Sequence, residues 1–277
     1  MSAAAIPRKD RAFFAMFRCA WQHRHLIALL VVRRVESRFR GSLLGKLWTA
    51  LIPLFMLGLY TFVFGFVLKV HWPGAARSQF EVALLYFAGL TLFDFYFECI
   101  SGAPALMLEN ISYIKKVVFP LEILPFVVLG GALVRLAVTS TILAVFYLAI
   151  VGLPAPAALA IPLILAPFAL VAVGIVWFVS ALGVYVHDLR QVVVLAAPVT
   201  MYLSPIFFPI SSVPEAARPL FYANPLTFII ETIRGALFDG TWPNWGILAL
   251  YAVLAWIFAS LGYYWFVKIK PGFADVI

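Results

Sequence analysis

Long apolar stretches separated by short polar segments dominate this chain. Six such stretches follow one another, at residues 48–68, 82–108, 123–151, 157–186, 192–210 and 245–267. Because a helix rises about 1.5 Å per residue, roughly 20 apolar residues cross a hydrocarbon core about 30 Å thick, whereas helices in soluble cores are usually shorter. The pattern therefore predicts an all-α polytopic membrane protein with six transmembrane helices.

Positive charges gather on one side of the predicted spans. The segment before the first span holds one anion, Glu36, and five cations, namely Arg33, Arg34, Arg38, Arg40 and Lys46. With six spans, fifteen of the twenty Lys and Arg residues fall on this side, four on the other side and one in a span. Positive flanks resist translocation, so residues 1–47 and 268–277 are both predicted to be cytoplasmic.

The composition excludes an ordinary soluble domain. The chain is 65% hydrophobic and 12% charged, against about 25% charge in typical soluble domains. Its net charge of +8 reflects the orientation of the cations rather than a nucleic-acid ligand. No signal peptide is expected before the first span. Cys19 falls in the N-terminal region and Cys99 in a span, so no disulfide is expected between them.

An amphipathic segment, Asp10 to Val32, precedes the charged run. Its polar side chains fall on one side of a helical wheel and its aromatic ones on the other, Arg11, Arg18, Gln22 and His25 opposing Phe14, Phe17 and Trp21. This pattern is typical of a helix that lies in the lipid interface. Such a helix either only anchors the chain or also contacts a cytoplasmic partner, and amphipathicity does not decide between the two.

Three charged residues lie inside predicted spans. Asp94 and Glu98 are four residues apart and share one face of the second span, which should look inward because charge is costly in lipid. Arg135 lies about twelve residues into the third span, at a depth comparable with that of Asp94. We hypothesise an ion pair between Asp94 and Arg135; the alternative is that Arg135 lines a water-filled path without a fixed partner.

Residues 211–240 are apolar but interrupted by prolines and charges, namely Pro214, Glu215, Arg218, Pro219, Pro225, Glu231 and Arg234. Asn224 before Pro225 predicts a helix start and Gly240 a helix end. Between them an apolar stripe, Leu226, Ile229, Ile230, Ile233 and Leu237, is expected opposite Glu231 and Arg234. We predict two short re-entrant helices that dip into the outer leaflet; one further span is the alternative, disfavoured by the charges and prolines.

Motifs for catalysis, nucleotides or metals are missing from the sequence. The segment from Gly41 to Lys46 superficially resembles a phosphate-binding loop, but the glycine spacing is wrong and Leu47 stands where Ser or Thr is required. The four histidines show no metal-ligand spacing. We expect no catalytic residue, no metal and no cofactor in this chain, and a membrane-embedded transferase is a remote alternative.

Six segments, taken in order, resemble one family. They are residues 38–48 (RFRGSLLGKLW), 51–54 (LIPL) with 60–64 (YTFVF), 115–125 (KKVVFPLEILP), 203–209 (LSPIFFP), 224–227 (NPLT) and 273–277 (FADVI). As a set running the length of the chain, they resemble ABC-2 type permeases that export lipid-linked polysaccharide. The resemblance is to the exporters of O-antigen, capsule and teichoic acid, and it implies a multi-pass protein of the bacterial inner membrane.

The resemblance also implies partners and contact residues on the cytoplasmic side. Such permeases form homodimers around a polymer channel and bind a separate nucleotide-binding ATPase subunit, which holds ATP and Mg. The N-terminal interface helix, a gate helix near Arg33 to Lys46 and a short helix around Glu109 to Lys116 would contact that ATPase. The coupling residues of the last region would be Glu109, Asn110, Lys115, Lys116, Phe119 and Pro120. The gate helix would draw the lipid pyrophosphate with Arg33, Arg34, Arg38 and Arg40, since arginine suits phosphate.

Further residues are assigned by the same resemblance to the channel and to its outer mouth. The channel set is Tyr60, Phe62, Asp94, Glu98 and Arg135, and the outer-gate set is Pro205, Phe207, Phe208, Asn224, Pro225, Glu231 and Arg234. Aromatic faces stack on sugar rings, although any single ring in a span more often packs against helices or lipid. Two other functions stay open, an ABC-2 exporter of a small hydrophobic drug or lipid and, less favoured, a passive channel.

Overall fold

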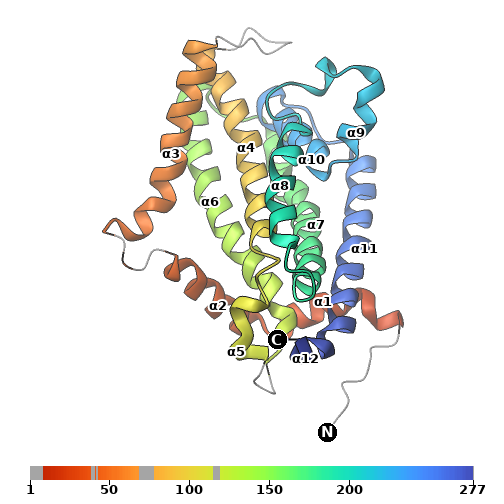
Figure 1. Cartoon of the computed structure of the whole chain (residues 1–277). Coiled ribbons are helices and arrows are strands. Elements are labelled where there is room, and N and C mark those ends of the chain that lie inside the picture. Colours follow the sequence, from red (N-terminus) through yellow and green to blue (C-terminus); the bar gives the residue numbers. More distant parts are fainter. Residues whose placement is uncertain (1–8, 39–40, 42, 69–77, 115–118, 277) are drawn as a thin grey trace.

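The computed structural model describes residues 9–38, 41, 43–68, 78–114 and 119–276, and this part of the chain is helical without strands (Figure 1). Its α-helices are α1 (Lys9–Gln22), α2 (Arg24–Ser37), α3 (Trp48–Tyr60), α4 (Gln79–Ser101), α5 (Ile111–Ile114), α6 (Leu124–Ile150), α7 (Ile161–Leu182), α8 (Leu189–Tyr202), α9 (Arg218–Tyr222), α10 (Pro225–Arg234), α11 (Trp245–Ile269) and α12 (Phe273–Val276). Shorter turns include η1 (Gly45–Leu47), η3 (Leu108–Asn110) and η4 (Leu121–Ile123). Two segments are π-helical, η2 (Thr61–Val67) and η8 (Gly235–Asp239).

Within the described residues, five helical segments are long and apolar enough to cross a membrane. They are Gly45–Val67, Gln79–Ser101, Leu121–Ile150, Pro156–Leu182 and Trp245–Gly272. The chain is therefore a polytopic helical membrane protein. In the stretch predicted as the fifth span, 192–210, the apolar helix α8 has only 14 residues and ends before Pro205. The count of six crossings stays a prediction.

Helix α4 lies at the centre of the bundle. Its residues 82–93 are all buried, and it contacts α3, α6, α7, α8 and α10. Such an uninterrupted buried run means that neighbouring helices cover every face of this part of α4, as expected for a helix apolar all round. Asp94 directly follows the buried run and is exposed. Asp94 is thus the first charged residue of the C-terminal half of α4.

Helices α7 and α11 pack closely against each other, with Gly174 and Gly262 at the contact, and close one side of the core. Trp177 of α7 is fully buried and stands edge-on to Phe126 of α6 and Tyr263 of α11. Its indole N–H donates to the Glu122 carbonyl at 3.1 Å, which satisfies the one polar atom of the side chain. This tryptophan joins α7 to α6 and α11.

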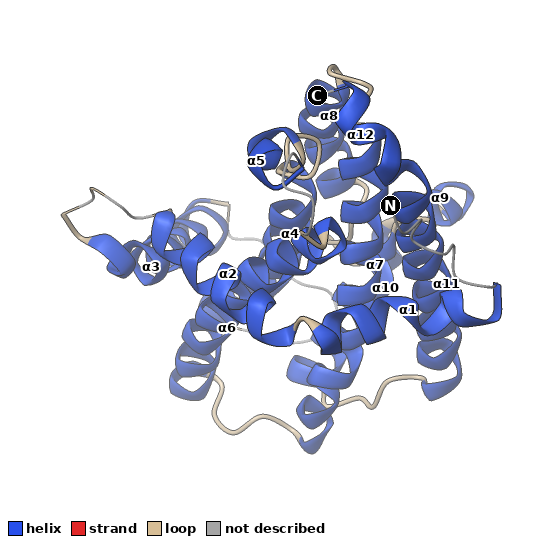
Figure 2. Ribbon diagram, turned by 90° about the horizontal axis from the view of Figure 1, so that it is seen from below, coloured by secondary structure: helices blue, strands red, loops and turns tan. Residues whose placement is uncertain are grey.

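The lower end of the bundle in Figure 1 is covered by the short helices α1, α2, α5 and α12. Seen from below, α1 and α2 run across the ends of the long helices (Figure 2). The helix predicted over Asp10 to Val32 is interrupted at His23 and forms two helices, of which α2 continues to Ser37; its position in the lipid interface stays a prediction. The first and last described helices, α1 and α12, lie at the same end of the molecule.

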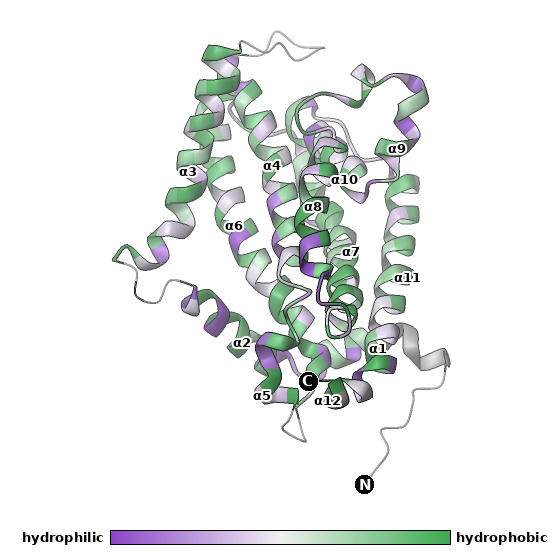
Figure 3. Ribbon diagram, in the orientation of Figure 1, coloured by the Kyte–Doolittle hydropathy of each residue, from purple (hydrophilic) through white to green (hydrophobic). Residues whose placement is uncertain are grey.

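Helix α3 and its π-helical extension η2 lie at the margin of the bundle and expose much apolar surface (Figures 1 and 3). Large apolar side chains that stay exposed include Phe55, Leu59, Phe62 and Phe66. Pro53 lies inside α3, where it removes a backbone donor. In a bilayer this surface faces lipid or another protein chain, because water would not solvate it favourably.

Candidate functional site

A cavity of about 410 Å³ lies between α2, α3, α4 and α6 near the lower end of the bundle. Its charged lining residues are Arg34, Arg38, Glu98, Glu109 and Arg135. We call this the lower cavity. With three guanidinium groups against two carboxylates, its lining favours anions, and arginine forks match the oxygens of a phosphate group.

Helix α2 reaches the cavity because α6 presents glycine at the point of contact. A Cβ atom built on Gly130 would lie 2.5 Å from Cγ2 of Val31, which is closer than two carbon atoms that are not bonded to each other can approach. Beside this contact, Leu30 is buried against Ile123 and Val127. Since Arg34 follows Leu30 by four residues, close packing of Leu30 directs Arg34 toward the cavity.

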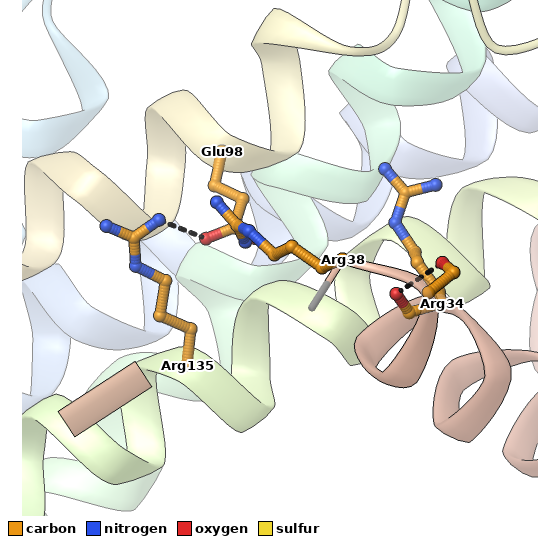
Figure 4. Close-up of polar contacts among 5 residues, drawn as sticks. Arg34, Arg38, Glu98 and Arg135 are labelled. Atoms are coloured by element: carbon orange, nitrogen blue, oxygen red, sulfur yellow. Dashed lines mark hydrogen bonds and ion pairs between the residues drawn. The ribbon is translucent and has the colours of Figure 1, made fainter. Parts of the chain in front are cut away.

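Glu98 binds two arginines, one with each carboxylate oxygen (Figure 4). Arg38 donates from Nη1 to Oε1 at 2.6 Å, and Arg135 donates from Nη1 to Oε2 at 3.3 Å. The hypothesised ion pair between Asp94 and Arg135 is therefore wrong in its choice of carboxylate. Glu98 lies one helical turn below Asp94, and counting residues from the helix ends does not resolve depth to one turn.

A second cavity of about 190 Å³ adjoins the first and shares Ile52, Pro53 and Arg135 with it. We call this the upper cavity; its polar lining residues are Tyr60, Thr91, Asp94, Arg135 and Thr139. Thr91 and Thr139 were not among the residues predicted from the sequence. Helical spacing could have identified both, because Thr91 precedes Asp94 by three residues and Thr139 follows Arg135 by four.

The remaining gate and channel residues fall in different places. Arg33 is exposed and lines neither cavity, and Phe62 likewise is exposed on η2 and lines neither. Arg40 lies outside the described residues. The gate helix expected from Arg33 to Lys46 is not continuous, because α2 ends at Ser37 and the turn η1 begins at Gly45. Lys46 pairs with Glu36 at 3.0 Å and so links the two pieces.

The short helix expected from Glu109 to Lys116 appears in part as η3 and α5 at the lower end of the molecule (Figure 1). Asn110 donates to the Leu106 carbonyl at 2.8 Å, and Phe119 stacks on Tyr113 with ring centroids 4.2 Å apart. Pro120 directly precedes η4. Glu109 is exposed and also lines the lower cavity, so this element contacts the cavity directly. Lys115 and Lys116 lie outside the described residues.

At the upper end of the bundle, Asn224 joins α10 to the end of α8. Its side-chain oxygen accepts from the Leu226 amide, which confirms the predicted helix start at Pro225, and Gly240 ends η8 with a positive φ of 66°. The side-chain nitrogen of Asn224 donates to the carbonyls of Thr200 and Leu203 and to the Ser204 hydroxyl. One side chain therefore satisfies backbone groups left over where α8 stops.

Arg234 is buried, with 4% of its surface exposed, rather than placed on a polar face opposite the apolar stripe of α10. Its guanidinium donates to Leu85 and Ile206 carbonyls at 2.7 to 3.1 Å and also to that of Pro205. The prediction of its position is wrong because helical periodicity treats every charge as solvent-facing. Here unpaired carbonyls of the broken segment after α8 supply the partners.

The other outer-gate residues gather around the same segment. Phe207 lies beside Tyr86, Phe64 and Tyr202, and its carbonyl accepts from the Tyr86 hydroxyl at 3.1 Å. Phe208 packs edge-on against Phe221 of α9. Aromatic packing and backbone hydrogen bonds therefore join α4, α8, α9 and α10 at this end of the bundle.

Comparison with known families identifies the family to which this chain belongs. The family model described as ABC-2 type transporter matches residues 25–238, which include both cavities and the buried Arg234 cluster. The chain belongs to the ABC-2 type transporter family. The permease is thus a multi-pass transporter subunit.

Curated relatives of this ABC-2 permease carry a shared name. O-antigen export system permease protein RfbA of Myxococcus xanthus is 24% identical over 247 residues, covering 87% of this chain and 92% of the relative. Two proteins of the same name from Klebsiella pneumoniae are each 26% identical over 259 residues, covering 91% of this chain and 96% of theirs. The permease is therefore similar along nearly its whole length to proteins named for O-antigen export.

Proposed function

We propose that this ABC-2 permease exports lipid-linked polysaccharide of the O-antigen, capsule or teichoic-acid type across the bacterial inner membrane. Two independent lines support the proposal. The curated relatives are named for O-antigen export and are similar over about nine-tenths of the chain. The arginine-lined lower cavity fits the anionic head of a lipid carrier, and this is the single structural observation that carries the substrate class.

The two adjoining cavities suit the two chemical parts of such a substrate. Arg34, Arg38 and Arg135 of the lower cavity would bind the lipid phosphates. Above them, Asp94 together with Tyr60, Thr91 and Thr139 offers acceptors and donors for sugar hydroxyls. A polysaccharide presents many hydroxyls and no fixed sequence of charges, so a few polar groups beside aromatic rings are sufficient to guide it.

The energy would come from a separate ATPase subunit that holds ATP and Mg. The element formed by η3 and α5 lies at the lower end of the molecule, beside α1 and α2 (Figure 1). Because Glu109 lies on this element and also lines the lower cavity, a push on η3 would reach the cavity within one helical turn. Lys115 and Lys116, which lie outside the described residues, are proposed contacts with the ATPase.

A homodimer would cover the apolar surface of α3 and η2 and enclose the polymer channel between two copies. The support is the set of exposed large apolar side chains on this marginal helix, which includes Phe55 and Phe62. At the upper end, α9 and α10 would form the outer gate. Their contacts through Asn224 and Arg234 with the end of α8 couple that gate to α4 and α8.

The genetic test deletes the gene and restores it with variants. Deletion should remove surface polysaccharide and leave lipid-linked polymer inside the cell, and the wild-type gene should restore export. The double variant Arg34→Gln with Arg38→Gln should not restore it, whereas Arg33→Gln should, because Arg33 lines neither cavity. Unchanged surface polysaccharide after deletion would refute the proposed function.

A second candidate function, export of a small hydrophobic compound or lipid, is favoured by a different observation. An apolar cavity of about 200 Å³ lies between α4, α6, α7 and η8, lined by residues such as Leu92, Leu143 and Leu237. It would take a hydrocarbon group and no sugar. Sensitivity of the deletion strain to hydrophobic drugs, with normal surface polysaccharide, would support this second function over the first.

A further inference from the structure

We propose that Glu98 is a built-in competitor for the phosphate site, which a diphosphate displaces and a single phosphodiester does not. The proposal rests on the proposed function for the identity of the ligand. Its geometric basis is that one carboxylate occupies Arg38 and Arg135 at once, at 2.6 and 3.3 Å, inside the lower cavity (Figure 4). Glu98 thus holds the place that a substrate anion would take.

The three paired residues come from three different elements. Glu98 belongs to α4, Arg135 to α6, and Arg38 caps the end of α2. The carboxylate therefore fastens the end of α2 to two long helices. Arg38 has 51% of its side chain exposed and Glu98 20%, so an anion arriving from the cytoplasmic end has access to the pair.

Displacement would release the end of α2 and change its link to α3. Ser37 donates to the Arg34 carbonyl at 2.9 Å, and Glu36 pairs with Lys46 of η1, which directly precedes α3. A movement of Arg38 away from Glu98 is therefore transmitted through the last turn of α2 to the start of α3. Binding of a ligand in the lower cavity would in this way move the start of α3, the helix that carries the exposed apolar face.

Charge explains why the competitor gives selectivity. The phosphodiester of an ordinary phospholipid carries one negative charge, no more than Glu98, and it would have to separate an existing ion pair. A diphosphate carries more charge and more acceptor oxygens, enough to engage Arg34, Arg38 and Arg135 together. Replacing the Glu98 carboxylate by the phosphodiester of an ordinary membrane lipid is therefore unfavourable. In this way Glu98 excludes these abundant lipids from the site.

The test measures ligand binding to the permease with its ATPase in lipid nanodiscs. The probes are a polyprenyl diphosphate, inorganic diphosphate and phosphatidylglycerol. Glu98→Gln should bind the polyprenyl diphosphate about five- to tenfold more tightly and should gain binding of phosphatidylglycerol, since the lost competitor is a partly exposed ion pair. Inorganic diphosphate should compete for the site, which separates recognition of the head group from recognition of the hydrocarbon.

Two further variants control the interpretation. Glu215→Gln removes a carboxylate that is 90% exposed at the other end of the molecule and should leave every affinity unchanged. Glu98→Asp keeps the charge on a shorter side chain and provides a second measurement if Glu98→Gln does not fold. It should bind phosphatidylglycerol more weakly than Glu98→Gln does.

A spin-label distance provides a structural readout, measured both without and with ligand. Labels on cysteines introduced at Ser37 and Ser101, in a background without Cys19 and Cys99, report the separation of α2 from α4. Glu98→Gln should broaden that distance without ligand, and the polyprenyl diphosphate should broaden it in the wild type.

The outcomes distinguish a failure of the Glu98 proposal from a failure of the proposed function. Equal diphosphate affinity in wild type and Glu98→Gln overturns the competitor while leaving the proposed function intact. Failure of inorganic diphosphate to compete overturns phosphate recognition in the lower cavity. Absence of any diphosphate binding in all variants refutes the proposed substrate, and the competitor falls with it.

Discussion

Arg234 illustrates at the scale of one residue how buried charge is accommodated in this permease. Its guanidinium serves carbonyls of Leu85, Pro205 and Ile206, which come from α4 and from the broken segment after α8. The fit is close, since a Cβ atom on Gly89 would lie 2.6 Å from the guanidinium. Several backbone acceptors thus depend on one side chain.

Replacing Arg234 by methionine should destabilise the protein by about 3 kcal/mol or more, because buried carbonyls lose their donors at about 1–3 kcal/mol each. Thermal unfolding in detergent measures the change. Arg218→Met is the matched control at the same end of the molecule, since Arg218 also donates to two carbonyls, those of Val213 and Ser211, but its side chain is 36% exposed and water can replace it. Equal unfolding temperatures for the two variants would contradict the role given to Arg234.

Cys19 on α1 provides a pH-dependent probe of how α1 packs against the lower end of the bundle. Burial, together with the nearby Glu122 carboxylate, raises the pKa of its thiol from 9.0 to about 11. A raised pKa leaves less thiolate at any pH below it, so at pH 8 the folded protein should hold about a hundredfold less reactive thiolate than an unshifted thiol. The same shift favours folding below pH 9 and loses its contribution as pH rises toward 11.

Alkylation of Cys19 in a Cys99→Ser background measures this effect. The rate should rise about tenfold per pH unit between pH 7 and pH 10 and should increase sharply when α1 is detached by denaturant. A rate at pH 8 equal to that of a free thiol would show that α1 does not pack against the bundle.

At the same scale, the sequence predicted helix ends correctly but did not predict which side chains of two neighbouring helices meet. Asn224, Pro225 and Gly240 mark helix ends correctly because capping depends on neighbouring backbone atoms alone. The partner of Arg135 was wrong by one turn, Glu98 instead of Asp94, because it depends on how α4 and α6 rotate and slide against each other. A single sequence carries no record of that register.

At the scale of elements, the contact of α2 with α6 decides where the arginines lie. Gly130→Val should push α2 away from α6, since even a Cβ atom at this position would meet Val31 at 2.5 Å. We expect export to fall at least tenfold while the protein still inserts into the membrane.

Cysteine cross-linking between α2 and α6, together with surface polysaccharide, provides the measurement. Gly246→Val on α11 is the control, because the nearest atom to a Cβ atom there, the side-chain oxygen of Asn244, lies at an ordinary contact distance of 3.4 Å. Normal cross-linking and normal export in Gly130→Val would show that α2 does not depend on this contact.

Hydrophobic length predicted the long helices well but not their interruptions. Apolar stretches of about 20 residues or more leave few options, so spans such as α4, α6, α7 and α11 follow from composition alone. The break at His23, the π-helical turns η2 and η8 and the early end of α8 depend on packing against other elements. Hydropathy does not contain that information.

At the scale of the whole molecule, the two ends of the bundle differ in chemistry. The lower end holds the arginine-lined cavity and the short helices α1, α2, α5 and α12, and the upper end holds α9, α10 and the buried Arg234 (Figure 1). The proposed export path runs from the first end to the second along α3, α4 and α6. In this proposal the charged end binds the substrate and the closely packed end releases it.

Reconstitution of ATP-dependent export tests this account most directly. The permease and its ATPase are placed in vesicles loaded with lipid-linked polysaccharide on the ATPase side, and a lectin detects polymer on the other side. We predict ATP-dependent exposure that requires both proteins, survives Arg33→Gln and falls at least tenfold in the double variant Arg34→Gln with Arg38→Gln. Transport that needs no ATPase subunit, or nucleotide hydrolysis by the purified permease alone, would contradict it.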